Sequence, residues 1–218
     1  MYTIVGRYSV RVRGSFACFT RPEFKAERMS YEVLTPSAAR GVLEAILWKP
    51  AISWHIRRIQ LLSPVRFIQF KRNEVNSRIA TPAVTTASRG GARIEDYFAE
   101  EDRAQRNTLA LRDVDYAVNV EMAMTSRAGP ADNPKKFDDI FRRRLERGQF
   151  HMQPYLGCRE FPALVTPYTG DPKPIESESR YLGVMLHDIR YAASGNEAVF
   201  FEARLEKGIV EIPAWRWA

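Results

Sequence analysis

Two adjacent lysines stand where a helix is predicted to begin, an arrangement that suits a phosphate group. Asn133 and Pro134 are typical of a helix N-terminus, so Lys135 and Lys136 fall in the first turn. Free backbone N–H groups there favour an anion. RNA can be cut without a metal if a base deprotonates the 2′-hydroxyl, an acid protonates the leaving oxygen and a cation offsets the phosphorane charge. Lys135 and Lys136 are candidate catalytic cations; the alternative is two solvated lysines.

Two of the three histidines are candidates for contact with the same ligand. His55 alternates with apolar residues in a predicted strand and shares its polar face with Arg57. His151 follows the second helix and is expected to turn toward the same cleft. The alternative for His55 is a satisfied polar residue at the sheet surface. His187 lies among apolar residues and is interpreted as structural.

Four aromatic residues are predicted to lie in the core, because apolar periodicity already explains their positions. They are Tyr8, Phe19, Trp48 and Tyr116. The alternative is that they are stacking platforms for bases.

The net positive charge of the chain lies in its first 75 residues. They hold 13 Lys and Arg against five acidic residues, while the whole chain carries +7. Many of these cations alternate with apolar residues, so a sheet face presenting arginines to a polyphosphate backbone is predicted. A merely soluble basic surface is the alternative. The candidate phosphate-binding residues are Arg11, Arg13, Arg57, Arg66 and Arg72.

Several other classes of site are not expected. No His, Asp, Glu or Cys cluster has metal-ligand spacing, and there is no Walker phosphate loop, dinucleotide fingerprint or Gly-x-Ser-x-Gly. We therefore expect no metal and no cofactor. No run of 18 apolar residues and no secretory signal is found, so a cytoplasmic protein with no membrane partner is predicted.

The order of predicted elements indicates an α+β protein. Strand, helix, strand, strand, loop, strand and helix follow one another over residues 1–150, which resembles a ferredoxin-like (RRM-like) βαβ–βαβ domain. Residues 151–218 are predicted to form a small antiparallel β subdomain. Residues 76–113 show no periodicity and are interpreted as a mobile insertion, with a ligand-ordered hairpin as an alternative. A bulge is predicted at Arg57–Arg58, where the apolar phase of a strand changes.

Specific segments resemble a known family. Residues 13–23 read Arg-Gly-Ser-Phe-Ala-Cys-Phe-Thr-Arg-Pro-Glu, residues 35–41 Thr-Pro-Ser-Ala-Ala-Arg-Gly, and residues 46–52 Ile-Leu-Trp-Lys-Pro-Ala-Ile. Residues 71–75 read Lys-Arg-Asn-Glu-Val and residues 156–163 Leu-Gly-Cys-Arg-Glu-Phe-Pro-Ala. Together with Leu-Gly-Val-Met-Leu-His-Asp at 182–188, they resemble the fifth family of CRISPR-associated proteins in its subtype I-C form, over nearly the full chain.

The resemblance implies a function that charge alone does not. Such proteins have a ferredoxin-like domain followed by a small β domain. They cut precursor CRISPR RNA within its repeat without a metal, leaving a 2′,3′-cyclic phosphate and a 5′-hydroxyl. They then stay on the 5′ handle in the Cascade complex. The implied partners are the CRISPR RNA and the backbone and large subunits, with target DNA left open.

The same resemblance implies a catalytic set from which this chain departs. The family has a Tyr just before Trp-Lys-Pro, where this chain has Leu47. It also has a Lys-His pair at the second helix, placed here on Lys136–Phe137, with Lys135–Lys136 as the alternative placement. His55 and His151 are then candidate substitutes for the base or acid. A non-catalytic, handle-binding scaffold subunit is the alternative, and an unrelated basic RRM-like protein is a third hypothesis.

Overall fold

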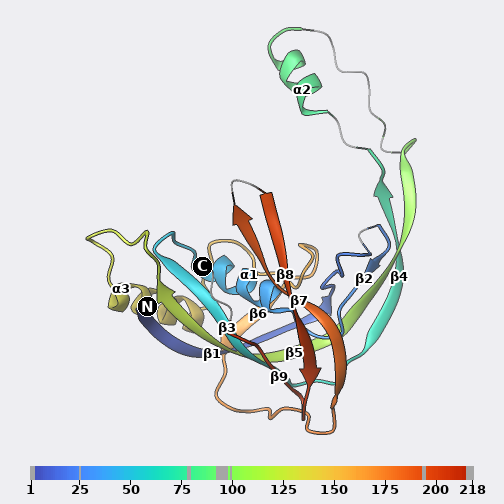
Figure 1. Cartoon of the computed structure of the whole chain (residues 1–218). Helices are drawn as coiled ribbons and strands as arrows, with labels where there is room; N and C mark the ends of the chain where they lie inside the picture. The colour runs from blue at the N-terminus through green and yellow to red at the C-terminus, as the bar shows by residue number, and fades with distance from the viewer. Residues whose placement is uncertain are drawn as a thin grey trace.

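A large, mainly antiparallel sheet forms the centre of the protein (Figure 1). The computed structural model describes residues 3–24, 26–77, 80–91, 98, 100–192 and 195–214. The main path of the sheet runs in the order β6-β1-β5-β3-β9. These strands are β1 Ile4–Ala17, β3 Ile52–Leu61, β5 Arg103–Met124, β6 Leu164–Pro167 and β9 Ile209–Glu211. The register of β3 on β5 shifts between Ile56 and Arg58, which confirms the predicted bulge.

Two helices begin where their capping residues predict. In α1 (Pro36–Ile46) the Thr35 hydroxyl accepts a hydrogen bond from the Ala38 N–H at 3.3 Å. In α3 (Pro134–Glu146) the Asn133 side chain accepts from the Lys136 N–H at 2.8 Å. Each cap satisfies a backbone donor that the helix leaves unpaired. Both helices therefore start at positions that the local sequence determines.

The helices cover one face of the sheet, and aromatic rings fill the space between them. The Phe141 ring of α3 packs edge-to-face on Tyr8 of β1 at 4.7 Å and lies tilted against Trp54 of β3 at 4.6 Å, measured between ring centroids. The Trp54 indole N–H also donates to the Leu47 carbonyl at the end of α1, at 3.0 Å. Tyr8, Phe19 and Tyr116 are buried, which confirms their predicted place in the core.

Residues 76–113 are more ordered than predicted. β4 (Phe67–Val75) pairs with β5 from Phe67 opposite Leu111 to Val75 opposite Arg103, so the two strands make the long arm seen at the right of Figure 1. α2 (Thr81–Ser88) lies beyond the arm. The predicted mobile insertion therefore contains a helix over 81–88 and part of a strand over 103–113, and the hairpin alternative is closer to this arrangement. The first residues of β5, 103–107, read Arg-Ala-Gln-Arg-Asn, so no apolar alternation marked this part of the arm as a strand.

The C-terminal third divides between two sheets. β7 (Arg180–Ala192) and β8 (Gly195–Leu205) form their own two-stranded sheet, whereas β6 and β9 join the large one. β2 (Arg28–Met29) adds a short parallel pairing to β5. The connection from β6 to β7 passes below the large sheet in Figure 1, and Tyr168 N–H and Ile175 N–H along it donate to Ser9 and Leu61 carbonyls. The domain boundary at residue 150 stays a prediction.

A largely buried ion pair joins the β7–β8 ribbon to α1, and breaking it is expected to destabilise the protein. Arg40 Nε and Nη2 contact the Asp188 carboxylate at 2.8–3.1 Å, and the side chains are only 20% and 14% exposed. Arg40→Met leaves the Asp188 charge unpaired, at an expected cost of about 3 kcal/mol in unfolding free energy.

Urea denaturation measures this cost. The double variant Arg40→Met/Asp188→Leu should recover most of the lost stability, because the more buried of the two carboxylates that pair with Arg40 is then removed, while Glu44, 2.7 Å from Arg40, is 29% exposed and keeps access to water. A single variant as stable as the wild type would contradict this account of the contact.

Candidate nucleic-acid interface

Lys136 lies in a small group of charges at the N-terminus of α3. Its Nζ is 3.1 Å from the Asp132 carboxylate, and the side chain is 45% exposed. The Gly129 N–H, then Lys136 and then Lys49 lower the pKa of Asp132 below its ordinary value. Lys49 follows the end of α1, so the charges of two different segments act on the same carboxylate. Lys49 was not among the residues predicted from the sequence to bind RNA, although it is the lysine of the Trp-Lys-Pro motif at 48–50.

Backbone contacts fix the two segments that carry these lysines. The corner after α1 and the loop before α3 lie side by side at the left of Figure 1. Thr125 Oγ1 donates to the Pro50 carbonyl at 2.6 Å, and the Thr125 N–H donates to the Ala51 carbonyl at 2.9 Å. The position of Lys49 relative to α3 therefore depends on the end of β5, where Thr125 follows Met124.

Lys135 has a different environment from Lys136. Its side chain is 83% exposed, and its Nζ pairs with Asp139 one turn further along α3 at 3.0 Å. Such an exposed i,i+4 pair contributes little to stability. Lys135 thus matches the description of a solvated helix lysine, while Lys136 faces the loop that carries Asp132.

The two positions at which this chain departs from its expected family pattern are both buried. Leu47 is 0% exposed and Phe137 is 1% exposed. Their side chains are hydrocarbon, so neither position supplies a proton-transfer group near Lys136. A cation beside a helix N-terminus can still bind a phosphate and stabilise negative charge that develops on it.

His55 lies on the face of the sheet opposite to α3. Its neighbours Trp54 and Ile56 point toward the helices, so alternation directs His55 away from them, and Ser53 Oγ is 2.9 Å from its Nε2. Burial, and then the charge of Arg57, lower the pKa of His55 below its ordinary value, which favours the neutral ring. The structure therefore does not bring His55 to Lys136.

His151 is exposed and lies at the other end of α3 from Lys136. The helix has 13 residues, so its ends are about 18 Å apart. The His151 N–H donates to the Ala45 carbonyl in the last turn of α1 at 2.8 Å. His151 is thus held at the carboxyl end of α1, and the predicted catalytic residues do not form one constellation.

Four of the five arginines predicted to bind RNA are paired with carboxylates. Arg11 contacts Asp115 at 2.6 Å, Arg57 contacts Glu121 at 2.6 Å, and Arg66 is 3.7 Å from Asp113. Arg72 pairs with Glu160. Strand alternation did place them on polar faces, but their acidic partners come from distant parts of the chain. Much of the predicted positive face is therefore neutralised within the protein.

Glu121 organises the polar face and was missed by sequence reasoning. It is 9% exposed and accepts hydrogen bonds from Arg7 and Arg57, both at 2.8 Å. Although burial raises its pKa, the hydrogen bonds and charges of Arg7 and Arg57 hold the net pKa below the ordinary value. One carboxylate thus offsets only one of the two positive charges that it contacts.

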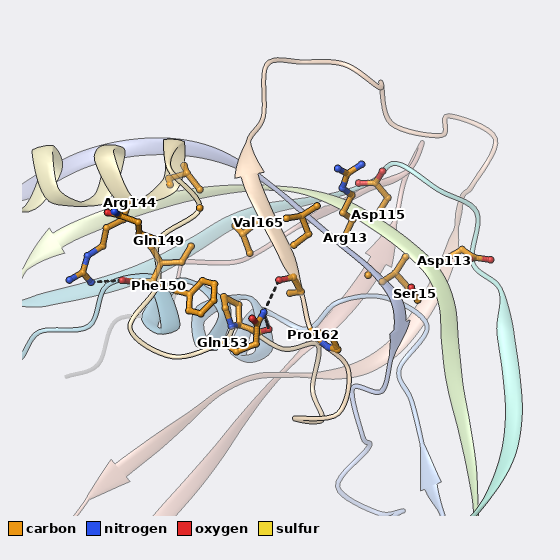
Figure 2. Close-up of a pocket in the computed structure, with 18 of the residues that line it drawn as sticks. Arg13, Ser15, Asp113, Asp115, Arg144, Gln149, Phe150, Gln153, Pro162 and Val165 are labelled. Carbon is orange, nitrogen blue, oxygen red and sulfur yellow. Dashed lines mark hydrogen bonds between the residues drawn. The ribbon is translucent and has the colours of Figure 1, made fainter.

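A cavity of about 660 Å³ lies apart from Lys136, at the carboxyl ends of α1 and α3 (Figure 2). Arg13, Arg144, Phe150 and Gln153 are among its lining residues. Arg144 is fixed by donation to the Ile46 carbonyl at 2.6 Å. Among the described residues Arg13 makes no ion pair, so it is the predicted RNA-binding arginine whose charge stays uncompensated.

Two kinds of feature are absent from the part of the chain that the structure describes. Among the described residues, no group of three or more His, Cys, Asp or Glu side chains is placed to hold a metal ion. Within the same residues, no helix has the length and apolar character needed to span a bilayer.

Comparison with known proteins decides the family. The family model Cas_Cas5d, described as "CRISPR-associated protein (Cas_Cas5)", matches residues 8–213. The chain belongs to the Cas5d family. This confirms the resemblance seen in the sequence motifs.

Curated Cas5d relatives match over nearly the whole chain. "CRISPR pre-crRNA endoribonuclease Cas5d" of Mannheimia succiniciproducens is 44% identical over 217 residues, covering 96% of each chain. The protein of the same name from Thermus thermophilus is 38% identical over 231 residues, covering 98% of this chain and 94% of the relative. The Cas5d assignment therefore extends from end to end of the described fold.

Solved structures share the Cas5d fold at low sequence identity. A structure described as a CRISPR-associated protein has a TM-score of 0.70 at 20% identity and covers 98% of this chain and 95% of its own. A functionally uncharacterized protein from Streptococcus mutans has a TM-score of 0.68 at 20% identity, with coverage of 98% and 94%. A chain of a CRISPR RNA-guided surveillance complex has a TM-score of 0.50 at 16% identity, with coverage of 96% and 92%.

Proposed function

We propose that this Cas5d protein is an endoribonuclease that cuts precursor CRISPR RNA within its repeat. The full-length relatives carry that activity in their names, at 44% and 38% identity. The structural observation that carries the proposal is Lys136, whose ammonium group lies beside the N-terminus of α3 next to the loop containing Asp132. A phosphate at this point would meet the positive end of the helix and at least one lysine.

The proposed reaction needs no metal. The 2′-oxygen attacks the adjacent phosphorus, its proton passes to a base, and the 5′-oxygen leaves with a proton from an acid. The products are a 2′,3′-cyclic phosphate and a 5′-hydroxyl. Lys136 stabilises the phosphorane charge, with Lys49 adding to the local positive potential. Because the side chains at positions 47 and 137 are buried hydrocarbon, positioning and electrostatic stabilisation carry most of the catalysis.

We further propose that the protein stays on the 5′ handle as a Cascade subunit in the cytoplasm. The fold likeness to a chain of an RNA-guided surveillance complex supports this role. The strand order β6-β1-β5-β3, with α1 connecting β1 to β3 and α3 connecting β5 to β6, would make the large sheet part of a ferredoxin-like (RRM-like) domain. Arg13 is the first candidate among the arginines for contact with the handle, since its charge is uncompensated within the described structure. The other four arginines would have to leave their carboxylate partners before they could contact RNA phosphates.

One observation favours a second candidate function. Leu47 and Phe137 are both in the core, and neither His55 nor His151 lies beside Lys136. A protein arranged in this way could bind the handle as a scaffold without cutting the repeat. The two functions share the RNA ligand and differ only in chemistry.

An assay with the repeat RNA in EDTA separates these functions. We expect one discrete cut near the 3′ base of the repeat hairpin, because the reaction proposed needs no metal. The downstream fragment should accept label from polynucleotide kinase without phosphatase treatment, as a 5′-hydroxyl does. An RNA of scrambled repeat sequence is the matched control. Intact RNA with shifted mobility would support the scaffold, and intact, unshifted RNA would contradict both functions.

A further inference from the structure

Trp48 is an exposed aromatic residue that the core does not explain. Its side chain is 55% exposed, although the sequence pattern predicted a core position and that prediction is wrong. Trp54, six residues later, is only 4% exposed, and its indole N–H is satisfied by the Leu47 carbonyl. The helix ends at Ile46, so Trp48 lies outside the apolar stripe of α1. Trp is enriched at interfaces, because its ring is apolar while its N–H can bond a polar partner.

The backbone that presents Trp48 is fixed on both sides. Before it, the Leu47 N–H closes the last turn of α1 on the Leu43 carbonyl at 2.9 Å, and the Leu47 side chain is fully buried. After it, the Ile52 N–H donates to the Lys49 carbonyl at 3.1 Å, and Thr125 holds the Pro50 and Ala51 carbonyls. The indole therefore projects from a rigid corner, and a ligand would not have to order this loop.

The positive charges near Trp48 indicate which kind of ligand would bind there. Lys49 follows Trp48 directly, and the Lys136 Nζ is 3.1 Å from Asp132, in the loop that lies beside this corner (Figure 1). Aromatic rings beside cations are typical of sites for single-stranded nucleic acid, where the ring stacks on a base and the cations contact the backbone. Every base has a π-face, so such a site tolerates different sequences.

We propose that Trp48 is a stacking platform for an unpaired base of the RNA, in the nucleotide next to the phosphate that Lys136 contacts. This inference rests on the proposed binding of repeat RNA and assigns a new contact to it. Stacking fixes the nucleoside, and a fixed nucleoside holds its 2′-oxygen and phosphate in a defined position. Trp48 thus acts as a positioning residue, and the proton transfers belong to other groups.

Binding measurements on RNAs with single abasic positions test this contact. Trp48→Ala should weaken binding of the intact repeat RNA by about 10-fold to 100-fold, since stacking contributes about 1–3 kcal/mol per base. Trp48→Phe should retain most of the affinity. An abasic position within two nucleotides of the cut should weaken wild-type binding by a similar factor. At that position Trp48→Ala should cause no additional loss, because the contact is already absent.

Tyr191→Ala is the matched control. Tyr191 is 69% exposed on the β7–β8 ribbon, so its loss removes an exposed ring elsewhere and should leave RNA binding unchanged. Trp48→Ala with wild-type affinity would overturn the stacking site while leaving the proposed function intact, and would point to a protein partner for this ring. The stacking site would also be overturned if Trp48→Ala weakened binding of every abasic RNA by the same factor, so that no abasic position removed the effect of the substitution. If the wild-type protein does not bind the repeat RNA, the proposed function fails and the stacking site fails with it.

Discussion

Replacing Lys136 by alanine is expected to slow cleavage of the repeat RNA by about 10²-fold or more, because it removes the cation proposed to stabilise the phosphorane. The backbone cap of α3 should survive, since Asn133 accepts its hydrogen bond from the main-chain N–H of residue 136 and not from the lysine side chain. Lys136→Ala therefore removes the positive charge and leaves the helix cap in place. Single-turnover rates in EDTA, at protein concentrations that saturate the RNA, measure the chemical step.

Lys135→Ala is the matched control for this prediction. It is the neighbouring lysine in the same helical turn, but it is 83% exposed and paired with Asp139. Its loss should change the rate only a few-fold, and Lys136→Arg should restore part of the activity by restoring the charge. Equal rates for wild type and Lys136→Ala would remove Lys136 from the mechanism.

Replacing Gly157 by alanine is expected to destabilise the protein by about 2–4 kcal/mol. The φ angle of Gly157 is +82°, in a region that costs an L residue roughly 1–2 kcal/mol. An added Cβ would also overlap the Cys18 carbonyl group, whose carbon would lie 2.7 Å away, and forced overpacking costs a further ~1–3 kcal/mol. The close approach brings the loop onto the residue that follows β1, since the Cys18 N–H donates to the Leu156 carbonyl at 3.0 Å.

The same substitution at Gly41 is expected to have the opposite sign. Gly41 lies inside α1, and nothing is within 4 Å of the position that its Cβ would take. Gly41→Ala should therefore stabilise the protein by up to about 1 kcal/mol, the difference in helix propensity. Urea denaturation of both variants measures the two effects. A Gly157→Ala protein as stable as the wild type would contradict the close approach to Cys18.

The local elements of the fold could be predicted from the sequence because their causes are local. Thr35 and Asn133 cap helices through residues three positions away, and the phase change at Arg57 marks a bulge through strand alternation. The distal part of β5, which pairs with β4, was missed, because residues 103–107 are almost all polar and carry no such alternation. Among the candidate site residues, the sequence predicted that Lys136 would stand at a helix start, and it does.

The sequence by itself thus determined the family, the helix starts and the polar faces of the strands. Only the tertiary structure decided what those faces meet. Arg11 and Asp115, or Arg57 and Glu121, are far apart in the chain and become ion pairs only when β1, β3 and β5 align. Tertiary packing also decided that His55 points away from Lys136 and that Trp48 stays exposed next to Lys49. Local patterns fix which way a side chain points along its own strand or helix, whereas its neighbours are set by the packing of distant segments.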